Sequence, residues 1–179
     1  MAFGMRSEHS TIIAYKGFNR DMTCRDMQYQ LGQTYIHDGP AHLCECGFHA
    51  CLLPSDIFRF YYPCEGALYT KVYLAKNGLD PMLESSNSKI CGRVIHIDNK
   101  LITVEELMNE ELLLIQAIKK VLRKRGVVIE QKWHYQEWHY IYWNLIFNWS
   151  CSSAECGTRL RYTNVSKILD IFSEAHELM

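Results

Sequence analysis

Residues Leu43–Tyr62 read LCECGFHACLLPSDIFRFYY. Within them, Gly47–Leu52 combines small, aromatic and apolar residues, which is typical of a buried strand. Pro54 suits the first turn of a helix, because a proline there removes no helical hydrogen bond. We therefore expect a buried strand that turns into a short helix. The apolar side of that helix would carry Ile57, Phe58, Tyr61 and Tyr62.

The density of cysteine in this stretch also raises a metal site and a reactive thiol as alternatives. The candidate ligands would be Cys24, Cys44, Cys46, His49 and Cys51. The short gaps between the last four do not fit the paired C-x₂₋₄-C spacing of structural zinc sites, and Cys151 with Cys156 has no second half. A catalytic thiol would need a base, for which His49 is near in sequence. We expect buried thiols, no metal and no cofactor.

Composition sets further limits on the class of protein. The 179 residues fit one domain, and the net charge of −1 gives no global basic excess for nucleic acid. Eight cysteines without an apolar signal segment favour a reducing compartment, so we expect the cytoplasm. The apolar runs are too short to span a membrane. The phosphate-loop, nucleophile-elbow, zincin and dinucleotide-binding motifs are absent from the sequence.

Three stretches are rich in β-branched and alternating residues and predict strands at Thr11–Phe18, Ala67–Leu74 and Lys89–Ile97. Gln28–Ile36 reads as an extended segment with a bend. A long helix is expected to follow the last strand and to pack on the sheet. We therefore predict a single α/β (α+β) domain with a mixed, mostly antiparallel sheet and an aromatic-rich C-terminal part.

The long helix is predicted from a capping box of Thr103 and Glu106, and it should run to about Arg125 and end at Gly126. Its expected apolar face is Val104, Leu107, Leu112, Ile115, Ile118 and Leu122.

The last fifty residues differ in composition. Trp133–Trp149 contains all four tryptophans and fits either a strand or a helix. A terminal helix over Asn164–Met179 should be capped by Asn164. Its inward residues would be Val165, Ile168, Leu169 and Phe172.

Lys16 lies inside the first predicted strand, between Tyr15 and Gly17. One reading is an outward-facing residue at a sheet edge. The other is a cation aimed into a cleft beside His49, where it would hold a phosphate or a carboxylate, since a buried lysine needs a partner. In the second reading Lys16 and His49 are the candidate catalytic residues of an enzyme. The sequence leaves open whether the protein is an enzyme.

A basic cluster closes the long helix and continues toward the tryptophans. One explanation is a solvated helix end that complements the helix dipole. The other is a surface for a partner or for nucleic acid, where cations meet phosphates and aromatic rings stack on bases. The candidate binding residues are Lys119, Lys120, Arg123, Lys124, Arg125, Lys132, Trp133, Trp138 and Trp143.

The motif Tyr15-Lys16-Gly17-Phe18, followed by Cys24, Gly-Phe-His-Ala-Cys at residues 47–51 and Tyr61-Tyr62, resembles a small uncharacterised domain family. Bacteriophages and prophages encode most members. The resemblance covers Ala14–Met108, which implies a phage-type core domain at 11–108. The remaining residues, 109–179, would be a helical and aromatic extension packed on the same fold.

The resemblance implies a phage or prophage origin, and small phage proteins of this kind are often counter-defence factors. The leading expectation is an anti-CRISPR inhibitor that binds a Cas protein–guide RNA effector, first of all a type II Cas9, in the host cell cytoplasm. One alternative is an enzyme that acts on RNA or a nucleotide, because Lys16, His49 and the following helix are also loosely similar to ADP-ribosyltransferase-like folds. The catalytic glutamate of those folds has no clear counterpart here. The other alternative is an oligomeric interaction module.

Overall fold

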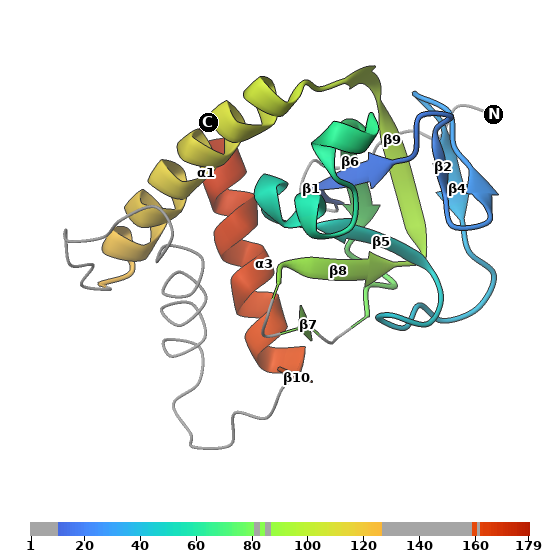
Figure 1. Cartoon of the computed structure of the whole chain (residues 1–179). Helices are drawn as coiled ribbons and strands as arrows, with labels where there is room; N and C mark the ends of the chain where they lie inside the picture. Colours follow the sequence, from blue (N-terminus) through green and yellow to red (C-terminus); the bar gives the residue numbers. More distant parts are fainter. Residues whose placement is uncertain (1–10, 81–82, 85–86, 127–158, 161) are drawn as a thin grey trace.

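The computed structural model describes residues 11–80, 83–84, 87–126, 159–160 and 162–179. They form one α+β domain, as the sequence predicts, with a six-stranded antiparallel sheet of order β4-β9-β6-β1-β5-β8 (Figure 1). The bounds of these strands are Thr11–Phe18 for β1, Thr34–Ile36 for β4, Phe48–Cys51 for β5, Leu68–Ala75 for β6, Lys89–Gly92 for β8 and Val94–Leu101 for β9.

The domain also contains short elements outside this sheet. Two of them are 3₁₀ helices, η2 at Pro54–Arg59 and η3 at Pro63–Glu65, each opened by its proline. The others are two short ladders, in which β2 (Thr23–Cys24) pairs with β3 (Met27–Gln28) and β7 (Leu83–Glu84) pairs with β10 (Arg159–Leu160). The hairpin of β2 and β3 follows directly from the end of β1.

β1 is a central strand whose two sides are paired very differently. Its pairing with β6 runs along the whole strand, from Thr11 opposite Ala75 to Phe18 opposite Leu68. On the other side, Tyr15 opposite Cys51 is the one registered pair that joins β1 to β5. The sheet therefore opens between β1 and β5 beyond Tyr15.

The predicted single strand at Lys89–Ile97 is wrong, because the structure divides it into β8 and β9. β8 forms one edge of the sheet beside β5, whereas β9 lies between β4 and β6 near the other edge. The chain turns at Gly92, where a Cβ atom would lie 3.0 Å from two leucine side chains. Since Arg93 alone joins these two strands, the sheet curls and brings its edges toward each other.

α1 (Val104–Lys124) begins with the predicted capping box, in which Thr103 and Glu106 each accept a hydrogen bond from the other's backbone N–H. Its predicted apolar face is partly wrong, because Leu112 is 47% exposed and Val104 is 38% exposed. The buried residues of α1 are Leu107, Glu111, Leu114, Ala117, Ile118, Val121 and Leu122.

The helix face predicted from apolar residues omits Glu111, which is charged but buried. Its carboxylate accepts hydrogen bonds from the Ser55 backbone N–H at 2.6 Å and from the Ser55 hydroxyl at 2.9 Å. Ser55 lies in the first turn of η2, so these bonds tie α1 to that helix.

α3 (Tyr162–Glu177) packs against α1 and β1, and the two long helices lie beside each other in Figure 1. The predicted cap is wrong, because the helix begins two residues before Asn164. Ile168, Leu169 and Phe172 are buried as predicted. None of the helices in the described part of the chain combines the length and apolar character needed to cross a bilayer.

The strand predicted at Gly47–Leu52 is confirmed as β5, but the expectation that the thiols of the cysteine-rich stretch are buried is only partly correct. Cys44 lies in an exposed turn with a φ of 69°, so it is not a buried thiol, whereas Cys51 in β5 is buried. Gly47 separates the turn from the strand with a φ of +89°, and a Cβ atom there would lie 2.8 Å from the Ala41 side chain. Glycine fits this position because it tolerates a positive φ and a close neighbour.

Candidate functional site

The opening between β1 and β5 forms a cleft of about 350 Å³. Six parts of the described chain line it: β1, the β2–β3 hairpin with Tyr29, His37 after β4, the Gly47–Cys51 stretch, η2 with the residues after it, and the start of β8. Beyond the pair Tyr15–Cys51, the Lys16 Nζ donates to the His49 carbonyl at 2.9 Å. A side chain thus satisfies a backbone acceptor at the point where the ladder ends.

Lys16 is buried, with 4% of its surface exposed. Its ammonium donates to the His49 carbonyl and to the Cys24 Sγ at 3.3 Å, and it lies 5.2 Å from the ring centroid of Tyr29. No carboxylate of the described residues pairs with it. An ammonium has three N–H donors and these contacts use two, so the third remains for a group in the cleft.

His49 holds the turn that leads into β5. Its Nε2 accepts a hydrogen bond from the Cys44 backbone N–H at 2.9 Å. Burial first, and then the positive charges of Arg25, Lys16 and Lys89, lower the pKa of His49 to about 4. At neutral pH the ring is therefore neutral, with one nitrogen already engaged as an acceptor. These contacts suit a positioning residue better than a general base.

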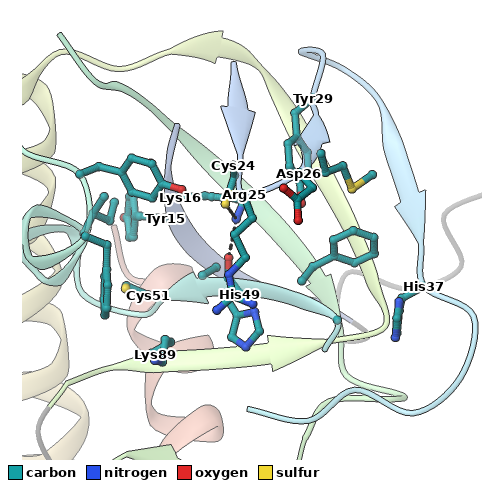
Figure 2. A pocket seen from close by; sticks show the side chains of 18 residues that line it. Tyr15, Lys16, Cys24, Arg25, Asp26, Tyr29, His37, His49, Cys51 and Lys89 are labelled. Atoms are coloured by element: carbon teal, nitrogen blue, oxygen red, sulfur yellow. Dashed lines mark hydrogen bonds between the residues drawn. The ribbon is translucent and has the colours of Figure 1, made fainter. Parts of the chain in front are cut away.

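Three cations surround His49 in the cleft, and each comes from a different element. Figure 2 shows Lys16 of β1, Arg25 of the β2–β3 turn and Lys89 of β8 around the imidazole. Arg25 has a φ of 54°, an uncommon conformation for a residue with a side chain, and such conformations often mark functional sites. Among the described lining residues, Asp26 is the one carboxylate. The cleft is therefore positively charged overall.

Aromatic rings form much of the remaining wall. Tyr29 and Phe48 line it with ring centroids 6.4 Å apart, and Phe60 and Tyr61, which follow η2, line it as well. Gly17 makes room for Tyr61, since a Cβ atom at Gly17 would lie 2.7 Å from that ring. Flat faces beside cations suit a ligand that carries both a ring and a negative charge.

Sequence reasoning identified Lys16 and His49, and the structure places both in this cleft. It missed Arg25, Lys89 and Cys24 as lining residues. Lys89 reaches the site because β8 pairs with β5, with Lys89 opposite Cys51. Arg25 reaches it because the β2–β3 hairpin folds over the opening. The sequence carried one usable signal, the position of Cys24 and Arg25 shortly after the Tyr-Lys-Gly-Phe motif.

The predicted basic cluster lies elsewhere. Lys120, Arg123 and Lys124 are exposed at the C-terminal end of α1, and Arg125 pairs with Glu174 of α3. Lys119 is half-buried. In Figure 1 this end of α1 (gold) lies on the opposite side of the molecule from the β2–β3 hairpin (blue). Lys132, Trp133, Trp138 and Trp143 fall outside the described residues.

Comparison with known proteins identifies a family, but no individual protein or solved structure. The model of a family described as a domain of unknown function, DUF7666, matches residues 12–110. Neither the curated proteins nor the solved structures contain a match. The matched region holds all of the lining residues of the cleft that the structure describes, whereas the basic end of α1 lies outside it.

Proposed function

We propose that this chain, which belongs to the family of the domain of unknown function DUF7666, binds a small anionic ligand with a flat ring in the cleft of its family domain. The ligand class is that of nucleotides. The observation that carries the proposal is the buried Lys16 ammonium, which has no carboxylate partner among the described residues and one N–H donor left for the cleft.

The charge of the cleft supports the anionic part of the ligand. A buried ammonium is costly unless it is paired, and a bound phosphate would supply the missing pair. Arg25 and Lys89 add two further cations around the same point, and an arginine fork can bind a phosphate through two N–H groups. Because all three converge from different elements, folding assembles the anion site before the ligand arrives.

The aromatic wall supports the ring of the ligand. Stacking of a base on an aromatic side chain is worth about 1–3 kcal/mol. Phe60 and Tyr61 both border the cleft, and the Lys89 Nζ lies 5.1 Å from the centroid of the Phe60 ring. The volume of about 350 Å³ lies near the lower end for ligand pockets. It therefore suits a small nucleotide rather than a nucleic-acid helix.

The loose resemblance to ADP-ribosyltransferase-like folds also implies a nucleotide cleft lined by Lys16 and His49. Catalysis by these two residues remains a prediction from the sequence. The contacts of His49 support a positioning role, in which replacing it would disturb the turn at Cys44 and weaken binding. Binding is therefore the first property to measure, and turnover the second.

Isothermal titration calorimetry with ADP, adenosine and inorganic pyrophosphate tests the proposal. ADP should bind more tightly than either part alone, because the cleft offers contacts to both. Lys16→Met should weaken ADP binding at least about tenfold, or about 1.4 kcal/mol. The matched control is Lys120→Met, an exposed lysine on α1 that should leave the affinity unchanged. No ADP binding at millimolar concentration, or equal affinity in Lys16→Met, would show the proposal to be wrong.

A second candidate is the phage-encoded anti-CRISPR inhibitor expected from the resemblance. Lys120, Arg123 and Lys124 favour it, because they are exposed at helical spacing on one face and no described carboxylate pairs with them. They would meet the guide RNA or an acidic surface of the effector. Replacing the three by Glu should abolish inhibition of a guide-RNA-loaded Cas9. Unchanged inhibition in that variant would exclude these residues, and a denaturing gel of the RNA would separate binding from cleavage.

A further inference from the structure

Two cations of the cleft hold cysteine sulfurs. The Lys16 Nζ lies 3.3 Å from the Cys24 Sγ inside the cleft, and the Lys89 Nζ lies 3.0 Å from the Cys44 Sγ at its rim. A sulfur differs from a carboxylate as a lysine partner because its charge changes with its oxidation state. Such pairs make the electrostatics of the cleft sensitive to thiol chemistry.

Cys24 is the better placed of the two sulfurs. It is half-buried, lines the cleft, and receives a hydrogen bond from Lys16. Burial first, and then a hydrogen bond with Cys24, raise the pKa of the Tyr61 hydroxyl, so Tyr61 also lies beside this sulfur. The Lys16 ammonium can also donate to an oxygen bonded to this sulfur.

Two other cysteines near the cleft are less accessible than Cys24. Cys51 and Cys91 are buried, and burial raises the pKa of each thiol, that of Cys91 to about 12. A thiol that resists deprotonation is a poor nucleophile. Cys64, in η3, is exposed and lies outside the cleft lining, so it serves as the natural reference for an accessible thiol.

We propose that Cys24 is an oxidation site for hydrogen peroxide, and that its oxidised form closes the cleft to anionic ligands. The effect on ligands rests on the proposed function, whereas the oxidation itself does not. In the first step the thiolate sulfur attacks a peroxide oxygen, an S–O bond forms, the O–O bond breaks, and the leaving hydroxide takes a proton to become water. The sulfur loses two electrons and the peroxide gains them. A second peroxide repeats the step and gives the sulfinate.

The closure follows from the distance between sulfur and ammonium. Since Lys16 Nζ already contacts the Cys24 Sγ, an oxygen on that sulfur lies within hydrogen-bonding reach of the same ammonium. A negative oxygen there pairs with the cation that would otherwise hold the ligand. The Lys16 ammonium is then no longer available to an anionic ligand, and the new negative charge repels that ligand.

Peroxide titration followed by peptide mass spectrometry tests the oxidation directly. A dimedone trap for the sulfenic acid and the mass of the sulfinate should both appear at Cys24 at peroxide concentrations at least tenfold below those that oxidise Cys64. Equal or faster oxidation of Cys64, or oxidation confined to Cys44, would overturn the assignment.

ADP titrations before and after peroxide test the closure. In the wild-type chain and in Cys64→Ser, oxidation should weaken ADP binding at least tenfold, whereas in Cys24→Ser the affinity should be the same before and after. Cys24→Asp, with a fixed carboxylate beside Lys16, should weaken binding without peroxide. If the reduced protein binds ADP and oxidation of Cys24 leaves its affinity unchanged, the closure is wrong. If the reduced protein binds no ADP, the proposed function fails and the oxidation map alone decides the role of Cys24.

Discussion

Lys16 and Gly17 are neighbours in β1 that shape the cleft in different ways. Side chains alternate between the two faces of a strand, so the lysine head and the bare glycine face different sides. Lys16 brings a cation to the end of the β1–β5 ladder. Gly17 lets η2 and Tyr61 approach the strand, because it has no side chain to displace them. One motif therefore places both the charge and the aromatic wall.

Gly17→Ala should destabilise the fold by about 1–3 kcal/mol through overpacking. The new Cβ would lie 2.7 Å from both the Ile57 side chain and the Tyr61 ring. Urea denaturation measures the change. In a Tyr61→Ala background the same substitution should cost less, because one of the two clashes is gone. Equal cost in both backgrounds would show that Tyr61 does not pack on Gly17.

The sequence could predict Lys16 and His49 as residues of one site, because each interrupts a strand pattern within two residues of a glycine. It could not predict Arg25 and Lys89. Their positions depend on a hairpin turn with a positive φ and on the pairing of Lys89 with Cys51, and neither leaves a local pattern. Nor could it predict that the Nε2 of His49 would be engaged by the backbone of Cys44.

At the scale of elements, α1 is positioned by a polar contact as well as by its apolar face. Glu111 accepts two hydrogen bonds from Ser55 and occupies the position that a search for apolar residues passes over. The junction of α1 with η2 matters for the cleft, because η2 carries the residues that lead to Phe60 and Tyr61.

Glu111→Ala should therefore cost about 1–3 kcal/mol of stability, since it leaves the half-buried Ser55 donors without their acceptor. Leu112→Ala is the matched control on the same turn. Because Leu112 is exposed, its replacement should change stability by less than about 0.5 kcal/mol. Chemical denaturation of both variants measures the two losses of stability. A larger loss for Leu112→Ala than for Glu111→Ala would show that Leu112 faces the core, as the sequence predicts.

α3 makes the stability of the fold dependent on pH through His176, whose ring centroid lies 6.3 Å from that of Tyr15. Burial, followed by the charge of Lys71, lowers the pKa of His176 from 6.5 to about 4. The unfolded chain therefore binds this proton more readily than the folded one. The stabilising contribution is complete above about pH 6.5 and is lost as the pH falls toward 4. His49 shifts in the same direction.

The urea midpoint should accordingly fall between pH 7 and pH 4.5, and His176→Leu should make that fall shallower. The exposed His42 provides the control, and His42→Gln should leave the pH dependence as it is. A wild-type midpoint that does not change over this range would contradict the buried neutral imidazole.

At the scale of the whole molecule, the cleft lies where β1 and β5 separate beyond Tyr15. The sequence predicts most strands and both long helices, since these depend on local periodicity. The break at Arg93 and the distant places of β8 and β9 follow from pairing across the sheet, which periodicity does not report. The basic end of α1 lies far from the cleft, so the two surfaces can be tested independently (Figure 1).

The most direct measurement of the central claim is an amide NMR titration of the ¹⁵N-labelled protein with ADP. Binding in the cleft should shift resonances of the β2–β3 hairpin, of Gly47–Cys51 and of Lys89, and leave those of Lys120–Lys124 unchanged. Lys16→Met should abolish these shifts at the same ADP concentration. Shifts confined to the end of α1, or none at all at millimolar ADP, would contradict a nucleotide site between β1 and β5.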